Sequence, residues 1–165
     1  MMFLSKKSHR GFTLIELLIV IAIIAILTGL LFSNFSGARE RARDTRRKSD
    51  LKQMQTALQL YNNDFNTFPL AGNGATIAGC GASGTSTCAW GSSFSAGSPT
   101  AVYMGALPQD PVNSGSFVYS YAPDATVDYK LTAKLENASD PDIQTSQTRC
   151  GVATPVAGVF MVCNQ

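Results

Sequence analysis

A single carboxylate, Glu16, stands near the start of a long apolar run and is well placed to take part in chemistry. Every other residue from Phe12 to Phe32 is apolar or small except Thr13 and Thr28. A charged side chain at the centre of a bilayer-spanning helix costs about 2.5–3.5 kcal/mol, but the first helical turn has free amides and a positive dipole end that favour an anion. We therefore expect Glu16 to pair with a cation near the helix start.

A glycine lies at the junction between the basic amino-terminal segment and the apolar run. Gly11 follows Arg10, and no small-residue cleavage site of the secretory type follows the apolar run. A cut after Gly11 would leave the helix attached and create an amine at Phe12, on the same helix face as Glu16 or within reach of a neighbouring copy. The alternative is an uncleaved signal anchor, in which Glu16 reaches toward the lipid headgroups.

The stretch Arg10-Gly11-Phe12-Thr13-Leu14-Ile15-Glu16 resembles the class III signal of type IV prepilins and type II secretion pseudopilins. The resemblance covers the chain to about Pro69. It implies that a membrane prepilin peptidase cuts after Gly11 and methylates the amine of Phe12. It also implies that Glu16 pairs with the terminal amine of an adjacent subunit during assembly.

Four cysteines form a second group of reactive side chains: Cys80, Cys88, Cys150 and Cys163. They allow three full pairings, and we expect the two local ones, Cys80–Cys88 and Cys150–Cys163. Loops of this size gain about 2–3 kcal/mol in chain-entropy models, and disulfides indicate an oxidising exterior. Free structural thiols are the alternative.

The sequence offers no enzymatic constellation and implies no cofactor. His9 is the only histidine and lies in the leader, and no P-loop or dinucleotide fingerprint is present. Asp140 and Asp142, with Glu136 and Asp124 nearby, are candidates for calcium ligands, because calcium prefers hard oxygen ligands. Their spacing follows no EF-hand pattern, so a solvated turn is the alternative.

Basic residues gather between Arg39 and Lys52, although the net charge of the chain is only +2. The near-neutral total argues against nucleic acid as the main partner. The cluster is either a solvated helix face or a contact for phospholipid headgroups, acidic groups on neighbouring subunits, or DNA.

A long helix must position these residues. Residues 12–35 are apolar, and a helix of this length, at about 1.5 Å per residue, can cross a membrane. They therefore predict a transmembrane or filament-core helix. Apolar residues then recur at spacings of three and four, which predicts an amphipathic helix over residues 36–65; these are Leu51, Met54, Leu58, Tyr61 and Phe65. Asn62–Asp64 and Pro69 supply a stop. Ser33 stands where many pilins carry a proline, so no proline-driven break is implied there.

The composition changes to glycine, serine, alanine and threonine over residues 71–100. This change predicts a long irregular connection with little buried apolar surface. Trp90 and Phe94 either tether this connection to the core or lie on an exposed adhesive surface.

The region 101–165 has the alternation of β-strands. Phe117–Tyr121 and Val127–Leu135 predict an antiparallel hairpin around a Pro123-Asp124 turn, and Gly158–Val162 predicts a third strand. A helix laid across this small sheet gives an α+β head over residues 36–165, the pilin fold that the resemblance implies.

These features predict the precursor of a structural subunit of a type IV pilus-like filament, with residues 1–11 as its leader. We expect a single-pass protein of the cytoplasmic membrane that later enters a filament at the cell surface. Its expected partners are copies of itself, a prepilin peptidase, the membrane, and a pilus or secretion assembly platform. The alternatives are a major pseudopilin of a type II secretion system and, from another class, a signal-anchored monomeric adhesin.

Overall fold

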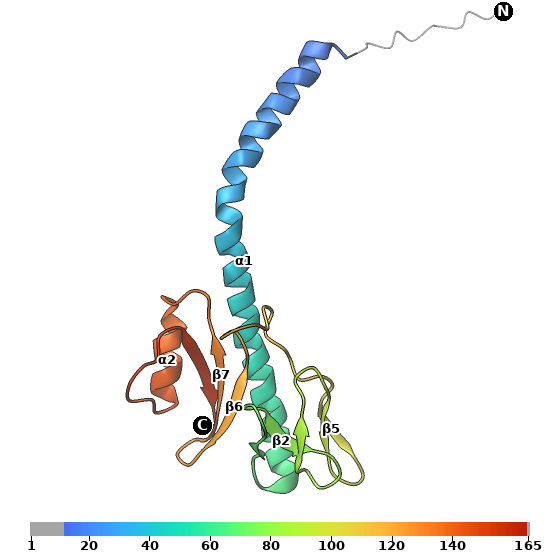
Figure 1. The fold of residues 1–165 in the computed structure, drawn as a ribbon, viewed down its shortest axis with the longest axis vertical. Helices are drawn as coiled ribbons and strands as arrows, with labels where there is room; N and C mark the ends of the chain where they lie inside the picture. The colour runs from blue at the N-terminus through green and yellow to red at the C-terminus, as the bar shows by residue number, and fades with distance from the viewer. Residues whose placement is uncertain (1–11, 165) are drawn as a thin grey trace, which may run out of the picture. The chain divides into compact units, whose positions relative to one another are not determined.

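The chain divides into two compact units, with the boundary between Arg39 and Glu40. The computed structural model describes residues 12–164, apart from the side chains of residues 30–34. The predicted leader, residues 1–11, lies outside this range, and so does the predicted processing residue Gly11. In the described part, the first unit contains a helix and no strand, whereas the strands all lie in the second unit, the head (Figure 1).

One helix, α1 (Leu14–Phe65), contributes to both units. Its backbone remains helical at Ser33, in agreement with the absence of a proline at this position. The helix ends close to the predicted stop: Asn66 has a positive φ of 52°, and its N–H donates to the carbonyl of Asn62 at 2.7 Å. Asparagine tolerates this left-handed conformation, and it therefore closes the helix.

The described part of the head, residues 40–164, contains three small antiparallel sheets and a second helix (Figure 1). The first sheet has the order β1 (Leu70–Ala71), β2 (Ile77–Cys80) and β3 (Ser86–Cys88). In the second sheet, β4 (Phe94–Ala96) pairs with β5 (Ala101–Met104). The third has the order β6 (Ser120–Asp124), β7 (Asp128–Lys134) and β8 (Val159–Cys163), and α2 (Pro141–Arg149) connects β7 to β8.

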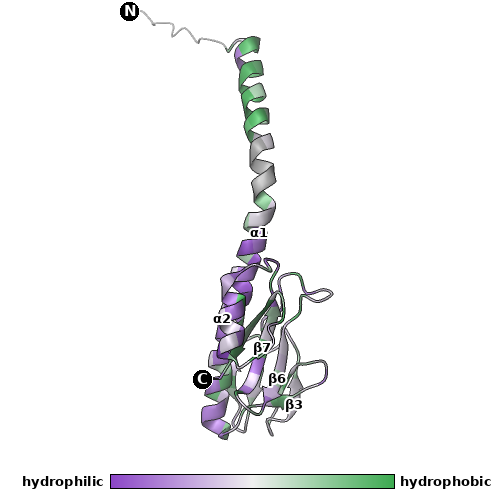
Figure 2. Cartoon of the chain, turned by 90° about the vertical axis from the view of Figure 1, so that its left-hand side faces the viewer, coloured by the Kyte–Doolittle hydropathy of each residue, from purple (hydrophilic) through white to green (hydrophobic). Residues whose placement is uncertain are grey.

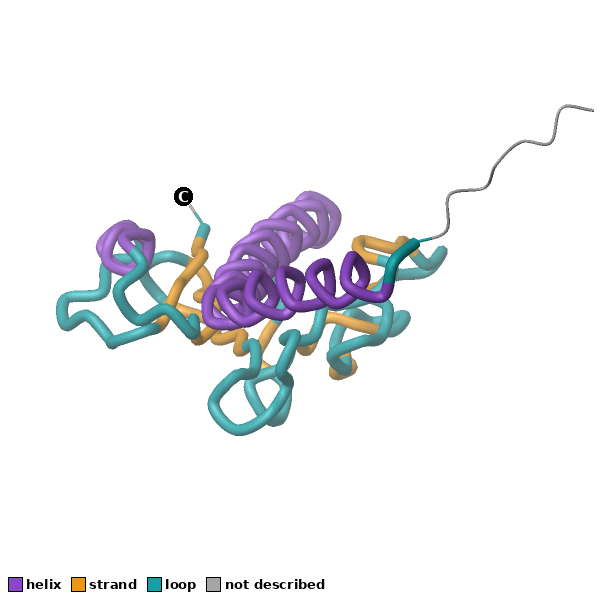
Figure 3. Tube along the Cα trace, turned by 90° about the horizontal axis from the view of Figure 1, so that it is seen from above, coloured by secondary structure: helices purple, strands orange, loops and turns teal. Residues whose placement is uncertain are grey.

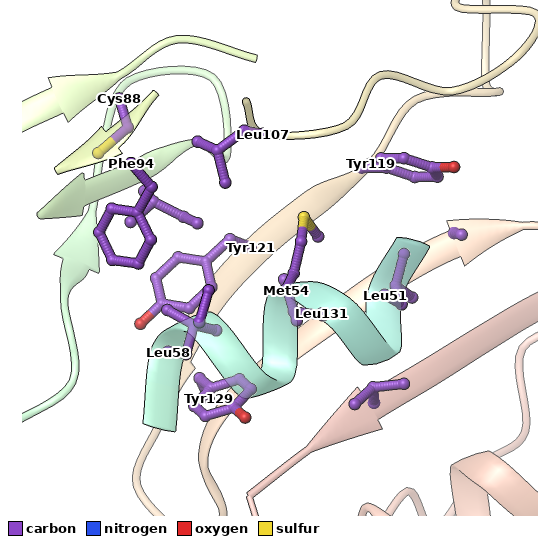
Figure 4. Close-up of a cluster of buried hydrophobic side chains, with 14 of the residues drawn as sticks. Leu51, Met54, Leu58, Cys88, Phe94, Leu107, Tyr119, Tyr121, Tyr129 and Leu131 are labelled. Carbon is purple, nitrogen blue, oxygen red and sulfur yellow. The ribbon is translucent and has the colours of Figure 1, made fainter. Parts of the chain in front are cut away.

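The predicted stripe of α1 supplies one wall of the core of the head (Figure 4). Leu51, Met54 and Leu58 are fully buried. They belong to one apolar cluster with side chains from the strands, among them Ile77, Phe94, Tyr121, Tyr129 and Leu131. Figures 1 and 3 show β6–β8 with α2 on one side of α1 and β2–β5 on the other. This packing of a helix on antiparallel sheets confirms the predicted α+β fold.

The predicted hairpin is confirmed, with a small shift of its turn. β6 and β7 pair antiparallel with Tyr121 opposite Leu131, and β8 adds to the other edge of β7. Pro123 and Asp124 belong to β6, so the turn starts after Asp124, two residues later than predicted. The Asp124 carboxylate accepts the N–H of Thr126 at 2.9 Å, which closes the turn locally.

The prediction of an irregular connection over residues 71–100 is wrong. Three strands lie in this stretch, β2 to β4, and Ile77 and Phe94 are fully buried in it. Trp90 also packs against the core, so both aromatic residues tether the segment. Small residues allow close approach: a Cβ on Gly84, whose φ is +66°, would lie 2.8 Å from the Tyr61 hydroxyl. Glycine here serves packing rather than disorder.

Helix α2 is absent from the sequence-based prediction. Asp140 is its N-cap and accepts the N–H of Asp142 at 2.9 Å, and Pro141 follows in the first turn. An aspartate followed by proline is a known helix start, because the side chain satisfies a free amide and the missing N–H of proline costs nothing there. This signal was available in the sequence.

Candidate assembly site

Helix α1 starts in a reciprocal cap formed by Thr13 and Glu16. The N–H and the hydroxyl of Thr13 both donate to Glu16 Oε2 at 2.8 Å, and the Glu16 N–H lies 3.3 Å from Thr13 Oγ1. The two side chains thereby satisfy amides that the first helical turn leaves free. Sequence reasoning placed Glu16 at the helix start but missed Thr13, although the T-x-x-E spacing indicates such a capping box.

Hydrophobic residues dominate the amino-terminal part of α1 (Figure 2), and their side chains are exposed. Phe12 is 85% exposed, and each large apolar residue from Leu14 to Leu27 is at least 48% exposed. Among the described residues, no helix meets the length and hydropathy required of a membrane span. A helix that is apolar all round is normally buried, so this surface needs a cover from outside the single chain.

The basic stretch of α1 divides into a buried and an exposed set. Arg47 belongs to the buried set: its Nε and Nη2 donate to the two oxygens of Asp110 at 2.6 and 2.9 Å. Its Nη1 donates to Asp44 and to Glu136, both at 2.7 Å. Burial opposes the charge of Arg47, but the hydrogen bonds to Asp110, Glu136 and Asp44 outweigh it and raise its pKa. No local pattern of residues indicates that this arginine would occupy the core.

Glu136, which follows β7, accepts hydrogen bonds from two arginines of α1. Arg43 Nε donates to Glu136 Oε1 at 2.7 Å, and Arg47 Nη1 approaches the same oxygen. The hydrogen bonds from Arg43, together with those from Arg47, lower the pKa of Glu136 to about 2 against the opposing effect of burial. The Asp44 carboxylate also accepts the backbone N–H groups of Glu136 and Asn137, each at 2.9 Å. The loop after β7 is therefore fixed on α1.

The candidate calcium ligands surround an ammonium group. Lys48 Nζ donates to both oxygens of Asp140 at 2.8 and 2.7 Å and to Asp142 Oδ2 at 2.7 Å. Glu136 is held by arginines, and Asp124 pairs with Lys130. Within the described part of the chain, no three or more His, Cys, Asp or Glu side chains gather as a metal site would require. Asp140 and Asp142 thus join the start of α2 to α1.

The exposed set contains Arg41, Arg46 and Lys52. The side chain of Arg46 is 64% exposed, and its Nε lies 3.7 Å from Asp50 Oδ2. The interpretation of the basic cluster as a solvated face therefore applies to these residues but not to Arg47.

Both local disulfides are present in the head. Cys80–Cys88 joins β2 to β3 with a Cα–Cα distance of 5.4 Å, and Cys150–Cys163 joins the end of α2 to β8 at 5.7 Å. These separations are normal for disulfides. Each bond closes a short loop, so it fastens neighbouring elements rather than distant parts of the chain.

The amino-terminal segment matches a known family model. Residues 6–32 match the family model described as the prokaryotic N-terminal methylation motif. The long helix that follows this motif and the small antiparallel sheets of the head are consistent with an α+β pilin fold.

Similar proteins share part of this chain. The chain is 47% identical over 62 residues to the type IV wide pilus major component PilA4 of Thermus thermophilus. These aligned residues make up 38% of this chain and 47% of the relative. It is 37% identical over 70 residues to the type II secretion system core protein G of Escherichia coli, and these residues make up 42% of this chain and 48% of the relative. The protein of the same name from Aeromonas hydrophila is 35% identical over 71 residues, which make up 43% of this chain and 50% of the relative. The chain thus spans about half the length of these curated relatives. No solved structure matches the chain.

Proposed function

We propose that this chain is the precursor of a type IV pilin-like filament subunit, cut after Gly11, methylated at Phe12 and polymerised through its amino-terminal helix. The apolar surface from Phe12 to Leu27, exposed on all faces directly behind a methylation motif, carries this proposal. Copies of the same helix cover this surface when they leave the bilayer and pack together. Head-to-tail contacts of this kind do not close on themselves, so they build a fibre.

Glu16 acts in this proposal as the residue that sets the register between subunits. Its capping box holds the carboxylate at the first turn of α1. When neighbouring helices surround it, the carboxylate lies in a medium of low dielectric constant, where an unpaired charge is costly and an ion pair is strong. The methylated amine of an adjacent subunit is the cation that satisfies it. A subunit that enters in another register leaves Glu16 buried without a partner.

The precursor in this proposal is anchored in the cytoplasmic membrane by residues 12–35, and the filament stands at the cell surface. A prepilin peptidase and an assembly platform are the required partners. The motif at residues 6–32 supports the first of these, because methylation needs a processed amino terminus.

A major pseudopilin of a type II secretion system is the second candidate, because several relatives are named type II secretion system core protein G. The identity to PilA4, 47%, favours the pilin. Shed fibres dominated by this chain support the pilin, whereas short cell-bound assemblies needed for protein export support the pseudopilin. A monomeric signal-anchored adhesin would form neither.

Mass spectrometry of the amino terminus in material from the cell surface tests the proposal. The expected species begins with a methylated Phe12. Retention of Met1 in the assembled or surface-exposed protein would overturn it.

Glu16→Ala tests the role of the carboxylate in assembly. The variant is expected to be processed as the wild type is, but to stay out of filaments when both are produced together. Glu40→Ala is the matched control, since Glu40 lies on the same helix beyond the apolar run. Normal incorporation of Glu16→Ala would contradict the register role.

A further inference from the structure

Within the head, α1 has an uncovered face as well as the face that packs on the core. Its residues recur at alternating spacings of four and three, and all of them are exposed: Ala42, Arg46, Ser49, Gln53, Thr56, Leu60 and Asn63. This repeat places all of these residues on one side of the helix. Arg46 is the one charged residue in the series, and Leu60 is a large apolar side chain left 48% exposed.

Two opposite charges mark the ends of this face. Arg46 and Asp64 are five helical turns apart, at about 3.6 residues per turn, so they point in the same direction about 27 Å apart along the axis. The Tyr103 hydroxyl donates to Asp64 Oδ2 at 2.8 Å, which orients the carboxylate. The salt bridges formed among the described residues do not include Asp64.

The Arg46 guanidinium is only loosely engaged within its own chain. The contact with Asp50 is 3.7 Å long, and the Asp50 oxygen involved accepts the Tyr119 hydroxyl at 2.7 Å. Arg46 and Asp64 are therefore an exposed base and an exposed acid at fixed positions on one rigid helix. Each is available to a partner.

We propose that the two ends of this face join parallel copies of the chain that are shifted along α1 by about 27 Å, so that Asp64 of one copy pairs with Arg46 of the next. Parallel copies without the shift place like charges opposite each other, which is unfavourable, so the charges select the register. The proposal rests on the proposed filament function, because copies inserted into one membrane with the same orientation meet in parallel. Every copy then has one Asp64 and one Arg46 to offer, and the contact repeats along the fibre.

Cysteine crosslinking in assembled filaments tests this contact. In the variant Arg46→Cys/Asp64→Cys, a bond within one chain is impossible, since a disulfide needs Cα atoms closer than about 7 Å. Oxidation is expected to give a ladder of multimers on a non-reducing gel. The control Arg41→Cys/Asp64→Cys should give none, because Arg41 is exposed but points about 140° away around the helix.

The outcomes separate this inference from the function on which it rests. Dimers without a ladder would indicate an antiparallel, closed pair and would overturn the proposal. Intact filaments that form no crosslink would also overturn it while leaving the filament function in place. Failure of the wild-type chain to form filaments at all would defeat both.

Charge reversal tests the contact without new cysteines. Arg46→Asp and Asp64→Arg are each expected to lower filament yield by about tenfold or more, as expected when a close charge pair is broken. The double swap Arg46→Asp/Asp64→Arg is expected to restore most of the yield. Arg41→Asp is the control and should assemble normally. A double swap no better than the single variants would overturn the pairing.

Discussion

Arg47 and Asp110 form an ion pair in which both side chains are 0% exposed, with two parallel hydrogen bonds of 2.6 and 2.9 Å. The pair joins α1 to the segment that leads into the third sheet. A buried charge is tolerated only when its hydrogen bonds are complete, and Asp44 and Glu136 complete those of Arg47. Directional bonds, as well as apolar packing, therefore position α1 in the head.

Arg47→Ala is expected to destabilise the head by about 3–5 kcal/mol, because it leaves the Asp110 and Asp44 carboxylates buried without their cation. Denaturant unfolding followed by the fluorescence of Trp90, the only tryptophan, measures this loss. Arg41→Ala removes an exposed arginine of the same helix and should change stability by less than about 0.5 kcal/mol. Equal stability of the two variants would show that the buried pair contributes little.

The stability of the head is expected to fall in acid. The pKa of Glu136 is lowered from 4.5 to about 2, so its stabilising contribution is complete above pH 4.5 and is lost as the pH falls toward 2. The pKa of Asp110 is also lowered, because hydrogen bonds from Arg47 and from backbone amides outweigh the opposing effect of burial. Protonation of Asp110 in acid therefore destabilises the head as well. Unfolding midpoints at a series of pH values measure the slope. Glu136→Gln should be less stable at neutral pH and less sensitive to acid; an unchanged slope would refute this assignment.

Thr13→Val is expected to loosen the first turn of α1 by about 1 kcal/mol, because it removes the hydroxyl of the capping box. Amide hydrogen exchange at Ile15 and Glu16 in detergent micelles should become faster by about fivefold. Thr28→Val is the control, since the Thr28 hydroxyl bonds to the Ile24 carbonyl within the helix. Equal exchange rates in the wild type and Thr13→Val would argue against the cap.

Removal of the disulfide by Cys150→Ser/Cys163→Ser is expected to cost about 2–3 kcal/mol, because it releases a short loop in the unfolded state. Since the bond joins α2 to β8, exchange protection should fall first in those two elements. Cys80→Ser/Cys88→Ser should instead loosen β2 and β3. Identical exchange changes in both double variants would contradict this local effect.

Much of the fold could be predicted because its signals are local. The stripe from Leu51 to Phe65 shows its helical period within one stretch of chain, and the β6–β7 hairpin shows its alternation in the same way. The short strands β2 to β4 were missed because small residues dominate that stretch, so packing rather than composition makes it ordered. Helix α2 has only nine residues, and its start signal, Asp140 before Pro141, is also typical of the solvated turn expected there.

The sequence by itself determined the parts of this protein that depend on neighbouring residues: the motif around Gly11 and Glu16, the long helix, the hairpin and the local disulfide pairing. Only the tertiary structure decided which charges are buried. Arg43, Arg46 and Arg47 look alike along the chain, yet Arg47 lies in the core and Arg46 is 64% exposed. The reason is physical: their environment is set by carboxylates such as Asp110 and Glu136, 63 and 89 residues from Arg47 in the sequence, which only folding brings to it.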